Sequence, residues 1–212
     1  MRNVPNCNQP LNPCGGGYYE MSFKSGLITG VSAASDLFAF RFHSVQANAI
    51  LKRCELKFLK IDFNITTGFT GAQEVDFAAF VARAYSASST GGNASQTPSA
   101  MQKHQTLYPN SEMVANGDIR IAATAALGAG TKTLDTFPFA SMAGFGAVGA
   151  AGKSIATPFQ EEFGEHHVPM VFRDNEGFVI QNITAFGAAG VGHLYVDVGW
   201  MEVPDDGMAN TW

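Results

Sequence analysis

The residues whose types and spacing come closest to a chemical motif lie at 147–154, which read Ala-Val-Gly-Ala-Ala-Gly-Lys-Ser. In a phosphate loop, backbone N–H groups wrap the phosphates; here Lys153 would neutralise their charge and Ser154 would hold magnesium. Such a loop follows a buried strand and opens a helix. Residues 143–146 make a poor strand, and Pro158 falls where the helix would run. The sequence therefore favours a surface loop over a nucleotide site.

The spacing of candidate metal ligands is also unfavourable. His166 and His167 are adjacent, so on a strand they would point to opposite faces and rarely reach one ion. Zinc sites use about four ligands at short paired spacings, which Cys7, Cys14 and Cys54 do not provide. We expect no metal, no cofactor and no catalytic residues, and therefore no enzyme. This expectation extends to the other histidines and to the carboxylates that could act as ligands or catalytic groups, which are His43, His104, His193, Asp62, Glu74, Asp76, Glu161, Glu162, Glu165 and Asp197.

The composition suggests a subunit that packs against other proteins. Of the 212 residues, 46% are hydrophobic and only 15% are charged, against about 25% charged residues in an ordinary globular protein. Charged residues are depleted in the cores of protein interfaces. A chain with this composition can fill a large core and also cover much of its surface with neighbouring subunits.

Charge and hydropathy argue against nucleic-acid and membrane partners. The formal net charge is -5, and the densest basic cluster is only Lys52, Arg53, Lys57 and Lys60. Binding to phosphate backbones requires more concentrated positive charge than this. No apolar run approaches the ~20 residues of a membrane span, and the first residues lack the basic and apolar regions of a signal peptide.

Alternation of apolar residues predicts several strands. In 37–43, Phe38, Phe40 and Phe42 fall on one face. Within residues 54–63 the apolar residues change from one face of the strand to the other, which predicts a bulge near Phe58. Residues 74–85 could be helical by propensity, but they lack an N-cap. We predict a strand there, with Phe77, Ala79 and Val81 on one face.

The C-terminal part gives the clearest pattern. Residues 177–183 predict one strand, and 194–200 predict a second strand that buries Leu194, Val196, Val198 and Trp200. We expect these two strands to pair and Pro204 to end the second. A short strand is predicted at 117–121 and a short helical turn at 101–107. Residues 122–157 are rich in Ala and Gly and give no periodicity.

These elements predict an all-β protein, an antiparallel β-sandwich of jelly-roll type with long loops. Residues 1–17 contain three prolines and end in three glycines, so we expect an extended N-terminal arm there. This arm is either a frayed terminus or a segment that becomes ordered on a neighbouring subunit. Residues 18–212 are predicted to form a single domain, because no change in composition divides them.

Aromatic residues in loop-like sequence have two interpretations. They either pack beneath the loops or serve as interface anchors or sugar-stacking platforms. The residues concerned are Tyr18, Tyr19, Tyr108, Phe145, Phe159 and Phe163.

Several stretches resemble structural proteins of tailed-phage particles. They cover most of 35–203, and the most specific are Glu-Gly-Phe-Val-Ile-Gln-Asn at 176–182 and the strand that ends at Trp200. The other stretches are 35–41, 68–77, 81–83, 118–126, 130–135 and 199–202.

The resemblance implies a jelly-roll capsid decoration (cement) protein that stabilises contacts between major capsid subunits. It implies that the chain is made in the bacterial host cytoplasm and is located in the virion. Its expected partners are the major capsid protein and copies of itself, as a homotrimer. It supplies no catalytic residues. The alternative is a tail- or fibre-associated module that binds a receptor or carbohydrate.

Overall fold

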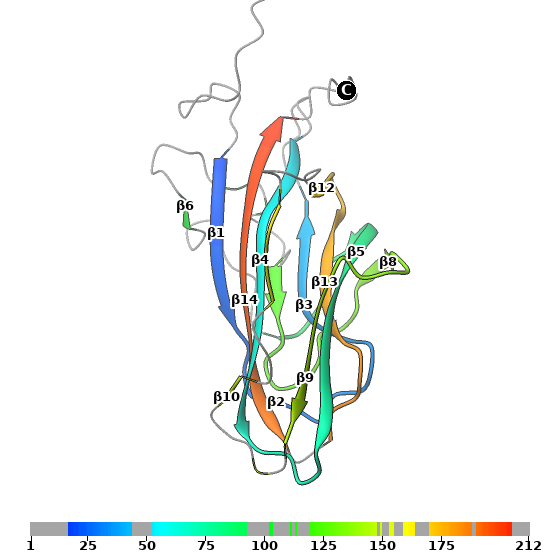
Figure 1. The fold of residues 1–212 in the computed structure, drawn as a ribbon. Coiled ribbons are helices and arrows are strands. Elements are labelled where there is room, and N and C mark those ends of the chain that lie inside the picture. The colour runs from blue at the N-terminus through cyan, green and yellow to red at the C-terminus, as the bar shows by residue number, and fades with distance from the viewer. Residues whose placement is uncertain are drawn as a thin grey trace, which may run out of the picture.

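The computed structural model describes residues 17–43, 52–92, 102–103, 111, 113, 119–147, 149, 153–154, 159–163, 170–187 and 190–204. Throughout this part of the chain the regular elements are β-strands, and they form two antiparallel sheets. The long strands of the two sheets run along the same axis as two packed layers (Figure 1). The predicted all-β antiparallel sandwich is confirmed.

The first sheet is 8-stranded and the second is 6-stranded. The first sheet runs in the order β10 (Lys153–Ser154), β4 (Lys52–Thr67), β14 (Val191–Pro204), β1 (Gly17–Lys24) and β6 (Gln102–Lys103). Three further strands lie off this path. Strands β11 (Phe159–Glu162) and β12 (Met170–Phe172) pair with β4, and β2 (Ile28–Thr29) pairs with β14. The second runs in the order β7 (Ile119–Ile121), β3 (Ser35–Phe42), β13 (Glu176–Asn182), β5 (Gln73–Ala87) and β8 (Thr131–Leu134), with β9 (Ala140–Gly146) also on β5.

The principal strands pair in a nested order. The first strand, β1, pairs with the last, β14; β3 pairs with β13, β4 with β11 and β12, and β5 with β9. Successive pairs alternate between the two sheets. A long hairpin rolled into two layers gives this arrangement, and it defines a jelly roll.

The interior between the sheets is filled by the residues that the alternation predicted. Leu194, Val196, Val198 and Trp200 of β14 are all fully buried. The three phenylalanines of β3 and the predicted inward residues of β5 join them in the main core. The segment 74–85 is therefore strand and not helix, as predicted. Its β-branched and aromatic neighbours across the sheet outweigh the helical propensity of its alanines.

The predicted bulge in β4 is confirmed. Phe58 pairs with Gly199 and Leu56 pairs with Trp200, so Lys57 is the extra residue on β4. Beyond the bulge, Leu59 faces the core, and Phe58 lies over Gly199. A Cβ at Gly199 would lie 2.4 Å from the Phe58 ring, so only glycine leaves room for it.

Several sequence expectations were wrong. The strands β13 and β14 do not pair with each other, because β13 lies between β3 and β5 in the second sheet and β14 lies between β1 and β4 in the first. Two residues of the expected helical turn, Gln102 and Lys103, form β6 instead. Strand β1 already begins at Gly17, the last residue of the expected arm; residues 1–16 lie outside the described residues.

The aromatic core generates a stability prediction. Phe178 is fully buried and contacts the rings of Phe38, Phe40, Phe139 and Phe172 at centroid distances between 5.1 and 6.0 Å. We expect Phe178→Ala to lower the free energy of unfolding by about 3–5 kcal/mol, measured by urea denaturation.

The matched control for this prediction is Phe145→Ala. The Phe145 side chain is 65% exposed, and we expect its removal to change the unfolding free energy by no more than about 0.5 kcal/mol. Equal losses in the two variants would contradict the assignment of Phe178 to the core.

Candidate functional site

The phosphate-loop look-alike does not have the geometry of a phosphate site at its Lys and Ser. Lys153 and Ser154 form the short strand β10, paired with Ile65 and Asn64 of β4. In a phosphate loop these two residues would open a helix. Their extended backbone instead extends the first sheet.

The described histidines and acids form no metal centre. No group of three or more His, Cys, Asp or Glu side chains in the described part of the chain is close enough to hold an ion. His43 lies 3.0 Å from Asp174, and His193 lies 2.9 Å from the carbonyl of Ser25. The pair His166–His167, together with His104, Cys7 and Cys14, lies outside the described residues.

Cys54 is fully buried and unsuited to nucleophilic chemistry. Burial raises the pKa of its thiol well above the ordinary value, and the nearby carboxylates of Glu202 and Glu55 raise it further. The thiolate is the reactive form. At neutral pH the Cys54 side chain therefore behaves as a small apolar group.

A buried carboxylate closes one end of the interior. Glu202 Oε1 accepts hydrogen bonds from Ser111 Oγ at 2.5 Å and from Trp200 Nε1 at 3.1 Å. Ser111 Oγ in turn accepts a bond from the Met113 N–H at 3.1 Å. This cluster, which sequence reasoning did not identify, attaches Ser111 and Met113 to Glu202 of β14. Its contacts are those of a structural anchor.

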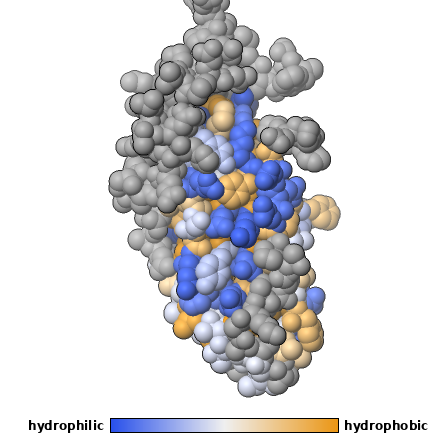
Figure 2. Space-filling view, turned by 60° about the vertical axis from the view of Figure 1, so that its left-hand side comes forward, coloured by the Kyte–Doolittle hydropathy of each residue, from blue (hydrophilic) through white to orange (hydrophobic). Residues whose placement is uncertain are grey.

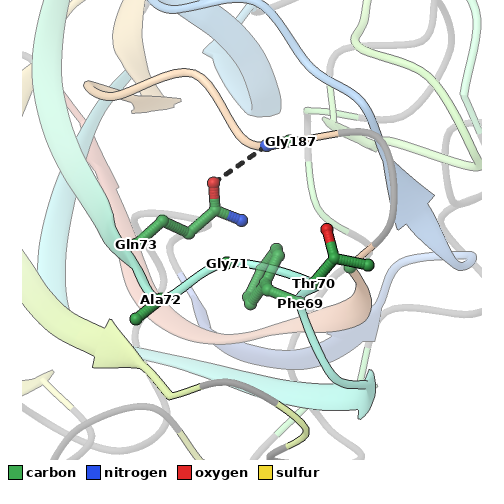
Figure 3. A pocket seen from close by; sticks show the side chains of 7 residues that line it. Phe69, Thr70, Gly71, Ala72, Gln73 and Gly187 are labelled. Carbon is green, nitrogen blue, oxygen red and sulfur yellow. Dashed lines mark hydrogen bonds between the residues drawn. The ribbon is translucent and has the colours of Figure 1, made fainter.

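A small pocket lies between the β4–β5 turn and the loop before β14 (Figure 3). Its volume is about 180 Å³, and its lining includes Phe69, Thr70, Gln73 and Gly187. Gln73 Oε1 accepts the Gly187 N–H at 3.0 Å, which ties the two loops together. Ligand sites for organic molecules usually exceed about 300 Å³, so this hollow is smaller than a typical site for such a molecule.

The outer face of the first sheet is polar. Lys60 lies 3.6 Å from Asp197, and Lys24 lies over the ring of Tyr195 at 5.6 Å from its centroid. In the view that brings the β1 side forward, hydrophilic side chains fill much of the described middle of the surface (Figure 2). A face of this kind is readily solvated.

The edge formed by β9 has the opposite character. We use the name β9 edge for the exposed side chains of Phe137, Ser141, Ala143 and Phe145. Phe137 is 81% exposed and Phe145 is 65% exposed, the highest values among the large hydrophobic residues described. No Asp, Glu, Lys or Arg occurs between Asp135 and Lys153.

The backbone of this edge has one strand neighbour. Among the described strands, β9 pairs only with β5. Natural edge strands usually carry charges or proline that prevent association, and β9 has neither. The uncharged, aromatic β9 edge is therefore the best candidate functional surface.

The aromatic residues singled out from the sequence have separate positions. Tyr19 is fully buried in β1, and Phe159 and Phe163 pack against the core. Tyr18 is half-buried on the other face of β1. Phe145 is on the β9 edge, and Tyr108 lies outside the described residues. Phe137 was not identified from the sequence as a candidate surface residue.

Comparisons add no relative. No protein-family model matches the chain, and no curated protein matches it. Within the described part of the chain, no helix has the length and apolar character required to cross a membrane.

The burial of Cys54 predicts its reactivity. We expect the peptide that contains Cys54 to remain unmodified when the folded protein is treated with iodoacetamide at neutral pH, because the raised pKa keeps the thiol protonated and burial excludes the reagent. In denaturant the same peptide should react fully. Mass spectrometry of digested protein measures both, and rapid labelling of the folded protein would show that Cys54 is accessible.

Proposed function

We propose that the protein is a non-enzymatic structural subunit of a tailed-phage virion, a decoration or cement protein that stabilises contacts between major capsid subunits. The observation that carries this proposal is the uncharged β9 edge with its two exposed phenylalanines. The resemblance of several stretches to phage structural proteins supports it further, and so does the jelly roll, a fold used by viral capsid domains.

The physical argument begins with the exposed rings. Burying a phenylalanine side chain is worth about 1.5–3 kcal/mol relative to leaving it in water. Phe145 lies on β9 and Phe137 lies three residues before β9 begins, and we propose that one partner surface covers both. Among the described strands, β9 has a partner only in β5, so its other side can supply backbone hydrogen bonds to a partner. Such a contact joins proteins without a deep pocket.

The absence of charged residues on β9 affects which partners can pack against it. A β9 edge brought against another copy of the chain would meet no like charge on β9 itself, and like charges opposite one another destabilise strand pairs. We therefore include self-association as a homotrimer, together with binding to the major capsid protein. A specific contact of this kind buries more than about 1,000 Å² in total.

The alternative function is a tail- or fibre-associated module that binds a receptor or carbohydrate. The exposure of Phe137 would also suit stacking on a sugar ring. Sugar sites add polar groups that converge beside the ring, and the β9 edge offers only Ser141 among its named side chains. Binding on a glycan array, combined with no binding to capsids, would favour this alternative over the cement role.

The cement role predicts a change in particle stability. Capsids assembled without this protein should lose their genome at lower temperature than complete capsids, because contacts between subunits are missing, and adding purified protein should restore the difference. Release of DNA on heating, followed by a fluorescent dye, measures this. Equal release temperatures with and without bound protein would contradict the proposal.

The β9 edge predicts which residues make the contact. We expect Phe137→Ser and Phe145→Ser each to weaken binding to undecorated capsids about tenfold or more, because interface anchors are worth at least about 1.4–2 kcal/mol. Leu27→Ser is the matched control, since Leu27 is 42% exposed and is not part of the β9 edge. Co-sedimentation measures binding. An effect of Leu27→Ser equal to that of the phenylalanine variants would exclude the β9 edge as the contact.

A further inference from the structure

Lys132 and Asp36 form an ion pair that is almost completely buried on the second sheet. Asp36 lies on β3 and Lys132 on β8, and Lys132 Nζ is 2.6 Å from Asp36 Oδ2. The Lys132 side chain is 5% exposed and that of Asp36 is 2% exposed. The two residues are 96 positions apart, so their contact is a product of the fold.

Apolar side chains and a few polar groups surround this pair and leave little of it exposed. Lys132 Nζ lies 5.2 Å from the centroid of the Tyr85 ring and also contacts the carbonyl of Ala129. The Leu127 N–H donates to the carbonyl of Asp36 at 2.8 Å. Tyr85 and Leu127 belong to a second core cluster with Ala39, Ala82 and Val179. Water is therefore largely excluded from the two side chains.

We propose that Lys132 and Asp36 condense to form an intramolecular isopeptide bond. Nζ and Oδ2 are within hydrogen-bond distance, and in the proposed step one proton passes from Nζ to Oδ2. The free amine then attacks the carboxyl carbon. A new bond joins Nζ to Cγ, the Cγ–Oδ2 bond breaks, and Oδ2 leaves as water with the transferred proton and a second proton from Nζ. The step requires no oxidant, reductant or cofactor.

The geometry around the pair supports each part of this step. Holding reacting groups together lowers the barrier to their reaction, and Lys132 Nζ lies 2.6 Å from Oδ2, the oxygen bonded to the carbon that it would attack. Gln181 Nε2 donates to Asp36 Oδ1 at 2.7 Å. That bond stabilises the negative charge that develops on Oδ1 when the carbon becomes tetrahedral.

Another ion pair in the same chain provides an internal comparison. Lys57 Nζ lies 2.9 Å from Glu55 Oε2, but the two side chains are 26% and 12% exposed. Both side chains keep contact with solvent, so we expect no condensation there. The nitrogen–oxygen distances of the two pairs are similar, and the pairs differ in how far their side chains are buried.

The test is the mass of the purified full-length protein. We expect its intact mass to be lower than the sequence mass by one water molecule, and a digest to contain one branched peptide that joins the segments around Asp36 and Lys132. The Lys57 and Glu55 peptides should be unmodified. An unaltered intact mass, with separate Asp36 and Lys132 peptides, would overturn the proposal.

Variants separate this reaction from other dehydrations. Lys132→Arg keeps the positive charge but lacks the amine, so the full sequence mass should return. Lys57→Arg should keep the lower mass. Loss of water through a cyclic imide at Asp206-Gly207 would persist in Lys132→Arg and would count against the isopeptide bond. The mass of the unaltered protein remains decisive even if Lys132→Arg folds poorly.

Discussion

The packing of aromatic rings between the two sheets is the interaction on which the rest of the structure depends. Trp200 of the first sheet stacks on Tyr19 at 5.6 Å and meets the edge of Phe40 of the second sheet at 5.4 Å. Phe40 continues to Phe178 at 5.1 Å. Each large ring removes much apolar surface from water and adds a favourable ring geometry. Because these rings come from strands far apart in the sequence, their packing requires the nested strand order.

The second sheet is constrained on both faces. One face meets the aromatic core, and part of the other is covered by chain near Leu127. That second face must accommodate Asp36 and Lys132, whose charges are costly to bury unless they are paired and hydrogen-bonded. The fold satisfies them with each other and with Gln181. A buried pair held in this way is also the place where the chain offers reactive groups without water.

The proposed function rests on a contrast between two surfaces. The outer face of the first sheet carries paired charges such as Lys60 and Asp197, and water solvates it. The β9 edge exposes phenylalanine beside a strand that carries no charge and that pairs only with β5 among the described strands. An isolated protein gains nothing from such an edge, whereas a subunit that packs against neighbours does. This contrast, and not any arrangement of catalytic groups, underlies the proposed role in a virion.

The sequence by itself determined the strands at 37–43, 54–63, 74–85, 177–183 and 194–200, the bulge near Phe58 and the sandwich, because period-two alternation depends only on local geometry. It did not reveal that β13 and β14 lie in different sheets, because strand pairing depends on packing between residues that are far apart in the sequence. Residues 122–157 were uninformative because small side chains leave no periodicity, so β9 and its exposed Phe145 emerged only in the fold. The contact of Asp36 with Lys132 was likewise decided by tertiary structure, which brings together groups that no local pattern connects.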